Sequence, residues 1–281
     1  MAYTTLISAD DLAQHYTQAN WVVLDCRHDL ANPQAGRQAY DAGHIQGAQF
    51  ASLDHDLADH ARGQNGAFRG RHPLPDPDVF VDTLRRWGVS DDTQVVAYDA
   101  QGGMFAARLW WMLRWVGHEA VAVLDGGLPV WTAQGMPVST EPFTPSRGNL
   151  QRRDALVRSV SADDILTRQG LSVLDARAPD RFRGENETLD PVGGHIPGAK
   201  NRFFKDNLQA DGRFKPAAQL RQELGALVAS PASAVMQCGS GVTACHNLLA
   251  LEVAGMPGAA LYPGSWSEWC SDPARPVATG D

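Results

Sequence analysis

Short apolar runs without polar alternation recur along the chain. Residues 22–24 and 95–97 are apolar throughout, and the run that begins at Ala234 ends at Cys238. A strand with one face in water alternates apolar and polar residues, so these runs predict strands buried on both faces. Such strands form parallel sheets covered by helices.

Helices are predicted between these strands. Ser8 and Ser161 each precede Ala-Asp-Asp, so a serine N-cap comes before acidic residues in a first helical turn. Residues 105–116 and 242–254 each predict a helix that follows a loop, and the tryptophans of the first are spaced as core residues. The pattern therefore predicts an α/β protein.

Four landmarks occur twice in the same order. Two copies of one domain explain this best, each a parallel sheet flanked by helices. The matching pairs are residues 21–27 and 171–177, 43–48 and 194–199, 95–99 and 234–238, and 124–131 and 261–269.

A stretch rich in proline and small polar residues, 137–149, lies between the copies and is typical of an extended linker. We expect an N-terminal domain over residues 1–141, a linker over 142–154 and a C-terminal domain over 155–281. Residues 55–78 also have the composition of a loop, and we expect this loop to help cover a cleft.

Composition narrows the function. The chain has 281 residues, 43% apolar content and four cysteines without a C-x-x-C pair, which argues against a disulfide scaffold or a zinc site. We expect no metal and no cofactor. The first residues lack a secretory signal and no apolar run reaches membrane-spanning length, so we expect a cytoplasmic protein. A net charge of −8 disfavours nucleic acid and anionic membranes as partners.

Cys238 ends a buried strand and precedes a helix, with glycines on both sides of Ser240. Because Gly239 and Gly241 can adopt positive φ, they can turn successive amides toward the sulfur, and the helix adds its positive N-terminal end. Both effects favour the thiolate, which is the reactive form of cysteine. The alternative is a small buried hydrophobe, which we expect of Cys26 and Cys245; the glycine loop favours a nucleophile at Cys238.

Three segments together resemble the tandem-domain rhodanese sulfurtransferases: the loop 238–244, the paired Gly-His-Ile-x-Gly-Ala segments, and Gly-Ser-Trp-Ser-Glu-Trp at 264–269. The resemblance covers almost the whole chain and implies two tandem rhodanese-like domains. The Cys-Gly-Ser-Gly-Val-Thr loop is similar to the 3-mercaptopyruvate branch, whereas the thiosulfate branch usually carries Arg-Lys after the cysteine.

The resemblance implies that the Cys238 thiolate takes sulfur from 3-mercaptopyruvate, a small anionic donor, and holds it as a persulfide. The outer sulfur then passes to cyanide or to a thiol, carried by a thioredoxin-like protein or a low-molecular-weight compound. We expect four loop amides to hold the negative sulfur, those of Gly239, Gly241, Val242 and Thr243.

Asp99 occupies the position in the first copy that Cys238 occupies in the second. A carboxylate cannot form a persulfide, so we expect a catalytically silent N-terminal domain. The active cleft is then expected between the two domains.

In the resembled family an arginine just before an aromatic residue binds the substrate anion, and Arg181 matches that position. Its guanidinium suits a grip on a carboxylate through two hydrogen bonds, and an ordinary surface ion pair is the alternative. Arg183 is a second candidate. Animal mercaptopyruvate enzymes carry a further arginine downstream, where this chain has the shorter, acidic segment 185–191.

In the resembled branch the loop hydroxyl works with a histidine and an aspartate of the N-terminal domain to move protons. Ser240 matches the hydroxyl and His44 the histidine, while Asp29 and Asp41 are both candidates for the aspartate. His195 holds the place of His44 in the other copy. A histidine that fixes a turn by hydrogen bonds to the backbone would serve both copies, so a structural role for His44 stays open.

Three other functions are alternatives to sulfur transfer from 3-mercaptopyruvate. A phosphatase of the related fold needs an arginine six residues after the cysteine, where this chain has Ala244. A thiosulfate:cyanide sulfurtransferase differs only in its donor and remains an alternative. A non-enzymatic module that carries a persulfide or binds a partner is the third possibility.

Overall fold

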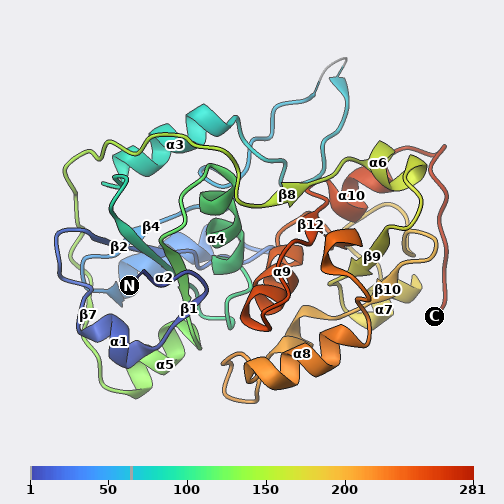
Figure 1. The fold of residues 1–281 in the computed structure, drawn as a ribbon. Helices are drawn as coiled ribbons and strands as arrows, with labels where there is room; N and C mark the ends of the chain where they lie inside the picture. Colours follow the sequence, from blue (N-terminus) through green and yellow to red (C-terminus); the bar gives the residue numbers. More distant parts are fainter. Residues whose placement is uncertain (1, 64–65) are drawn as a thin grey trace. The chain divides into compact units, whose positions relative to one another are not determined.

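The computed structural model describes residues 2–63 and 66–281 and divides into two compact units (Figure 1). The first unit holds the chain up to Asp59, together with Leu74–Leu156 and Gln209–Phe214. The second holds His60–Pro73, Val157–Leu208 and Lys215–Asp281. The segment His60–Pro73 thus belongs to the second unit although it lies within the first copy of the repeat. The expected domain limits at residues 141 and 155 stay a prediction.

The first unit is built on a five-stranded parallel sheet, as its buried apolar runs predict. Its strands, in spatial order, are β1 (Leu6–Ile7), β6 (Val121–Leu124), β5 (Gln94–Tyr98), β2 (Trp21–Asp25) and β4 (Gln49–Phe50). A small antiparallel pair joins β3 (His44–Ile45) to β7 (Val138–Ser139). The helices are α1 (Ala9–Ala13), α2 (Ala35–Ala42), α3 (Pro77–Arg86), α4 (Ala106–Trp115) and α5 (Gly127–Ala133).

The second unit repeats this sheet strand for strand, again in parallel. Its strands, in spatial order, are β8 (Arg158–Ser159), β12 (Ala260–Leu261), β11 (Ala234–Gln237), β9 (Ser172–Asp175) and β10 (Lys200–Asn201). The helices are α6 (Ala162–Thr167), α7 (Pro179–Arg183), α8 (Ala217–Gly225), α9 (Ala244–Val253) and α10 (Ser265–Trp269), with 3₁₀ turns η2 (Phe204–Asn207) and η3 (Pro231–Ser233). The predicted duplication of a parallel α/β domain is confirmed.

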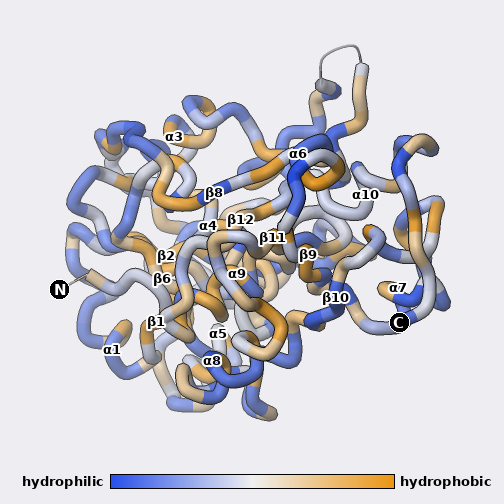
Figure 2. Tube along the Cα trace, turned by 45° about the vertical axis from the view of Figure 1, so that its right-hand side comes forward, coloured by the Kyte–Doolittle hydropathy of each residue, from blue (hydrophilic) through white to orange (hydrophobic). Residues whose placement is uncertain are grey.

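Burial and capping explain these elements. Every residue of β5 and of β11 is buried, which accounts for the missing polar alternation. The Ser8 hydroxyl accepts the Asp11 amide at 3.0 Å, and Ser161 forms a capping box with Asp164. Figure 2 shows hydrophobic positions gathered on the strands, with hydrophilic ones on the surrounding loops and short helices.

The duplicated motifs serve the same structural purpose in both units. At the end of β2, Asp25 pairs with Arg27, whose Nη2 also donates to the Gly43 carbonyl at 2.7 Å. At the end of β9, Asp175 pairs with Arg177, which donates likewise to the Gly194 carbonyl at 2.6 Å. Each buried ion pair thereby fastens a strand end to a Gly-His-Ile turn, which explains why both landmarks recur together.

A partly buried polar network links η2 to α8 in the second unit. Arg202 donates to Asn207 and to Glu223, the latter at 2.7 Å, and Lys215 and Gln219 also donate to Glu223. Burial by itself raises the pKa of Glu223, but these three donors outweigh it and lower the pKa to about 2. The carboxylate is therefore more stable in the folded protein than in the unfolded chain.

Glu223→Gln is expected to lower the free energy of unfolding by about 1–2 kcal/mol at pH 7. The pKa of Glu223 is lower in the folded protein than in the unfolded chain, so its carboxylate stabilises the fold at pH values above the unfolded pKa near 4.5. This stabilisation is lost as the pH falls toward about 2. The gap between wild type and variant should therefore shrink over that range when urea unfolding is measured at several pH values. The exposed Glu119→Gln serves as control; a gap that is constant with pH would contradict the assignment.

Candidate active site

Cys238 directly follows the central strand β11 and is 2% exposed. Its backbone is fixed at both ends, since its amide donates to the Ser265 hydroxyl at 3.1 Å and its carbonyl accepts the Trp266 amide at 2.9 Å. The Gly241 amide donates to the sulfur itself at 3.1 Å. The loop thus presents a backbone donor to the sulfur, a contact that is stronger with a thiolate than with a thiol.

The two glycines of this loop have different roles. Gly241 has φ +77°, and a Cβ there would clash with the Pro263 carbonyl, so both conformation and space require glycine. Gly239 does not have positive φ, and the expectation for that residue is wrong. A Cβ on Gly239 would instead lie 2.8 Å from Arg71 Nη2 and 3.7 Å from the Arg181 guanidinium. Glycine at this position lets two cations approach the peptide next to Cys238.

The first copy shows what the same loop can hold. Asp99 sits at the end of β5, and its carboxylate accepts four backbone amides at 2.8–3.0 Å, from Gln101, Gly103, Phe105 and Ala106. The loop and the first turn of α4 therefore surround both oxygens of the Asp99 carboxylate. The equivalent loop of the second unit leads into α9, whose N-cap residue Thr243 makes no side-chain cap.

Ser265 is held in an unusual conformation beside Cys238. It is fully buried and has φ +53°, a region that costs a residue with a Cβ on the order of 1 kcal/mol. The equivalent residue in the first copy is Gly127, with φ +61°. The serine hydroxyl accepts the Cys238 amide and donates to the Tyr262 carbonyl at 2.9 Å. The second copy thus keeps a strained serine whose hydroxyl positions the backbone of Cys238.

Ser240 contacts a histidine that motif comparison does not identify. His72 Nδ1 lies 2.7 Å from the Ser240 hydroxyl oxygen, and both side chains are buried. His44, the expected partner, is held within the first unit, where its ring nitrogens lie 2.8 Å from the Tyr40 carbonyl and 3.1 Å from the Glu141 carbonyl. Ser240 is therefore paired with His72, whereas the ring nitrogens of His44 face backbone carbonyls of the first unit.

The two motif histidines are held in matching ways. The His44 ring stacks on Tyr40 with centroids 3.9 Å apart, and the His195 ring stacks on Phe182 at 3.8 Å. His195 Nδ1 also lies 2.9 Å from the Phe182 carbonyl. This is the turn-fixing arrangement that the duplication favours for both.

Arg181, on the short helix α7, faces the Cys238 loop and is held by an acidic partner. Its Nε and Nη2 donate to both oxygens of Glu187 at 2.8–3.1 Å, and Nη2 lies 3.5 Å from Asp190. Burial raises the pKa of Glu187, but hydrogen bonds from Arg181 and from backbone amides lower it more, so this carboxylate stays ionised. Arg181 therefore keeps Glu187 as a permanent counter-ion, and its side chain is still 20% exposed.

Arg177 extends the same network to the end of β9. It is 1% exposed, pairs with Asp175, and reaches Glu187 at 3.3 Å. Its guanidinium carbon lies 4.8 Å from the centre of the Trp266 ring. Burial lowers the pKa of Arg177, but the neighbouring carboxylates Asp175 and Glu187 raise it overall. Arg177 is therefore a fixed positive charge within this buried network.

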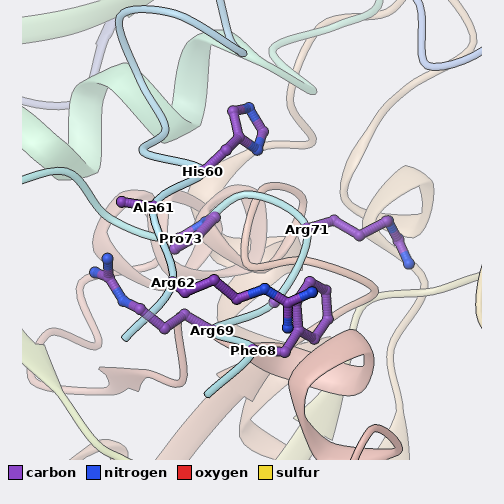
Figure 3. A pocket seen from close by; sticks show the side chains of 8 residues that line it. His60, Ala61, Arg62, Phe68, Arg69, Arg71 and Pro73 are labelled. Carbon is purple, nitrogen blue, oxygen red and sulfur yellow. The ribbon is translucent and has the colours of Figure 1, made fainter. Parts of the chain in front are cut away.

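The segment His60–Pro73 is fastened to the second unit next to the loop. Gly70 has φ +94°, and a Cβ there would lie 3.2 Å from the Gly264 Cα. The Arg71 amide donates to the Ser267 hydroxyl at 3.1 Å, and the Arg71 side chain pairs with Asp190. The segment also lines a pocket of about 240 Å³, in which Arg62 lies over the Phe68 ring while Arg71 extends away from both (Figure 3).

The other candidate side chains from the sequence contact residues close to them in the chain. Arg183 forms a solvent-facing ion pair with Glu185 at 2.7 Å. Asp29 accepts the Ala31 amide at 2.7 Å, and Asp41 pairs with the exposed Arg37. Sulfur contacts from Gly239, Val242 and Thr243 amides stay a prediction, as does a cleft between the copies.

The other cysteines differ from Cys238. Burial, and next to it Asp25, raises the pKa of Cys26 well above the ordinary value. Burial also raises the pKa of Cys270. Cys245 is buried on α9 and contacts the Gly241 carbonyl at 3.4 Å. Cys26 and Cys270 are therefore poor nucleophiles at neutral pH.

Two negative findings hold for the described part of the chain. None of its helices combines the length and the apolar character needed to cross a bilayer. Within residues 2–63 and 66–281, no three His, Cys, Asp or Glu side chains are grouped so that they could hold a metal ion.

Known proteins share this organisation. The Rhodanese-like domain family matches residues 8–134 and 160–272. A Pseudomonas aeruginosa protein named a probable 3-mercaptopyruvate sulfurtransferase is 47% identical over 287 residues, covering 100% of both chains. The thiosulfate sulfurtransferase of Gallus gallus is 34% identical over 255 residues, 88% of this chain and 85% of that protein. The solved 3-mercaptopyruvate sulfurtransferase from Leishmania major matches with a TM-score of 0.85 at 29% identity, covering 95% of this chain and 74% of that one. With both copies of its repeat matched, the chain belongs to the rhodanese-like domain family.

Proposed function

We propose that the protein is a sulfurtransferase that moves sulfur from 3-mercaptopyruvate to a thiol or to cyanide through a persulfide on Cys238. The observation that carries this proposal is the anion-binding loop. One amide already reaches the Cys238 sulfur, and the twin loop binds a whole carboxylate through four amides. A carboxylate oxygen of aspartate lies two bonds beyond Cβ, as the outer sulfur of a cysteine persulfide does. The Asp99 contacts therefore support a loop that can hold that outer sulfur.

In the first step the Cys238 thiolate attacks the sulfur of the donor. A sulfur–sulfur bond forms, the carbon–sulfur bond breaks, and its electron pair leaves with the enolate of pyruvate. The thiol group of the donor releases one proton, and the enolate carbon takes up one proton to give pyruvate. We propose that the hydrogen-bonded pair Ser240 and His72 relays this proton.

In the second step an acceptor thiolate or cyanide attacks the outer sulfur. The sulfur–sulfur bond breaks, and its electron pair returns to Cys238 as thiolate. The amide of Gly241 stabilises that thiolate as a leaving group. The cycle is therefore a two-step, ping-pong transfer with no external oxidant or reductant.

The proposal is tested by mass spectrometry of the intact protein after exposure to 3-mercaptopyruvate or thiosulfate, each followed by peptide mapping. We expect 3-mercaptopyruvate to add one sulfur atom to the Cys238 peptide and cyanide to remove it as thiocyanate. A gain with thiosulfate alone would favour the thiosulfate:cyanide alternative. No gain with either donor on folded protein would reject sulfur transfer and favour a binding module.

Arg181→Ala is expected to raise KM for 3-mercaptopyruvate by about 10- to 1,000-fold, the range for loss of a charge-assisted pair. The guanidinium lies against Gly239, next to the nucleophile, so it suits the donor's carboxylate. Steady-state kinetics with cyanide as acceptor measure the effect. Arg183→Ala, which removes a solvent-facing arginine of the same helix, is the matched control. Equal KM values for the two variants would remove Arg181 from the site.

A further inference from the structure

The segment His60–Pro73 concentrates positive charge in an acidic protein. It contains three arginines and no aspartate or glutamate, whereas the whole chain has a net charge of −8. Two of these arginines, Arg62 and Arg69, line the pocket of about 240 Å³ together with Phe68 (Figure 3). Neither step of the proposed transfer uses these two side chains, so the pocket is a basic site without an assigned ligand.

Arg62 faces solvent and keeps its positive charge. Within the described residues its contacts are with neutral groups: Nη1 donates to the Gly66 carbonyl at 3.4 Å, and the guanidinium carbon lies 5.8 Å from the centre of the Phe68 ring. An aromatic ring stabilises a cation without neutralising it. Phe68 is 38% exposed, so an apolar surface lies beside the charge. This pair of side chains suits a ligand that has a carboxylate on a carbon chain.

The pocket borders the residues that contact the cysteine loop. Arg71 also lines the pocket, and its side chain extends out of it (Figure 3). A Cβ built on Gly239 would lie 2.8 Å from Arg71 Nη2. The next residue, His72, has its Nδ1 2.7 Å from the Ser240 hydroxyl oxygen. The pocket is thus separated from the peptide after Cys238 by about the length of one arginine side chain.

We propose that this pocket binds a carboxylate of the sulfur acceptor, and that the acceptor is a small peptide-like thiol whose carboxylate lies several bonds from its sulfur. The inference rests on the proposed function, because it gives a site and a chemical class to the second substrate of that transfer.

Size and reach determine this class. Pockets that enclose a whole drug-sized ligand measure about 300–1,000 Å³. A pocket of about 240 Å³ instead accommodates the carboxylate end of such a molecule and leaves its thiol outside, toward the loop. In 3-mercaptopyruvate only two carbons separate the sulfur from the carboxyl carbon, so the donor is too short to bridge from Arg62 to Cys238. The pocket therefore distinguishes the acceptor from the donor by length.

The transfer to such an acceptor needs no further reactant. The acceptor thiol loses its proton to solvent, and its thiolate attacks the outer sulfur of the Cys238 persulfide. A new sulfur–sulfur bond forms, the bond to Cys238 breaks, and Cys238 takes the electron pair as thiolate. The acceptor leaves as its own persulfide. Arg62 takes no part in these bond changes; it attracts an anionic thiol to a protein whose net charge repels it.

The test measures the second step by itself. Protein loaded with sulfur on Cys238 and freed of donor is mixed with glutathione or with its glycine ethyl ester, which has the same thiol and one carboxylate fewer. Rapid-quench mass spectrometry follows the loss of the persulfide. At low glutathione concentration Arg62→Ala should slow transfer about three- to tenfold and Arg62→Glu about 10- to 100-fold, whereas Arg62→Lys should stay close to wild type. Transfer to the ester should respond less, and transfer to 2-mercaptoethanol, which has no carboxylate, should not change.

Arg168→Ala is the matched control, because it removes the same charge from an exposed ion pair next to α6. High ionic strength should reduce the difference between Arg62→Ala and wild type, since the charge faces solvent. Equal losses for Arg62→Ala and Arg168→Ala, or an equal loss with 2-mercaptoethanol, would reject the pocket. An effect of Arg62→Ala on transfer to reduced thioredoxin but not to glutathione would also reject it and indicate a protein partner instead.

Binding without chemistry separates this inference from the proposed function. S-methylglutathione keeps both carboxylates and has no thiol, so its calorimetric titration into the Cys238→Ser protein reports on the pocket alone. Adding Arg62→Ala should weaken this binding about three- to tenfold. If that result holds but wild type gains no sulfur, the pocket stands and the proposed function fails. If Cys238 gains sulfur but binding does not depend on Arg62, the pocket is rejected and the proposed function stands.

Discussion

Cys238→Ser is expected to abolish sulfur transfer, with a loss of at least about 10³-fold in turnover and no added sulfur in the mass spectrum. A serine oxygen can accept the Gly241 amide, so the loop should keep its shape, but it cannot form a persulfide. We therefore expect the Cys238→Ser protein to transfer no sulfur and to keep the thermal unfolding midpoint of the wild type.

The control for this variant is Cys26→Ala, which removes a buried cysteine whose pKa is raised by burial. It should load one sulfur as wild type does. Residual loading in Cys238→Ser that disappears only when a second cysteine is also replaced would move the nucleophile to that residue and contradict the mechanism.

His72→Ala is expected to slow persulfide formation from 3-mercaptopyruvate about 10²- to 10⁴-fold, the range for loss of a positioned acid–base group. His72 lies 2.7 Å from the Ser240 hydroxyl, so Ser240→Ala should cost a similar factor and the double variant little more. Rapid-quench mass spectrometry across a range of pH measures the loading step.

A second donor distinguishes proton transfer from a purely structural role for His72. Thiosulfate carries no S–H proton, so loading from thiosulfate should be affected far less than loading from 3-mercaptopyruvate. His60→Ala, in the same segment, is the control, since its ring centre lies 6.4 Å from that of His72. Equal losses with both donors would mean that His72 only shapes the loop.

The fold could be predicted because its signals are local. Ser8 and Ser161 cap helices through contacts three residues away, and the apolar runs at β2, β5 and β11 need only burial on both faces. The repeat then predicted that the same parallel-sheet domain occurs twice. Cys238 could be found for the same reason, since its strand, loop and helix are contiguous.

The side chains around the Cys238 loop could not be predicted in full because they come from distant parts of the chain. His72 and Ser240 are 168 residues apart, and Arg71 and Asp190 are 119 apart. The loop of residues 55–78 has no hydrophobic periodicity that would indicate which part of the protein it contacts. Motif position favours His44. The same motif recurs in both copies, and in each copy its histidine contacts backbone carbonyl groups.

Gly239 illustrates a second limit. A glycine in a turn usually signals positive φ, and Gly241 follows that rule. At Gly239 the absent Cβ makes room for two guanidiniums that arrive from α7 and from residue 71. Close approach by distant groups leaves no mark on the local sequence.

The placement of His60–Pro73 has a consequence for how the two copies must be encoded. A gene truncated to residues 155–281 would still encode the cysteine loop, but the protein would lack Arg71 and His72. Deletion of the first copy would therefore remove residues that contact the cysteine loop of the second. The second unit is thus complete only when both copies are translated from a single reading frame.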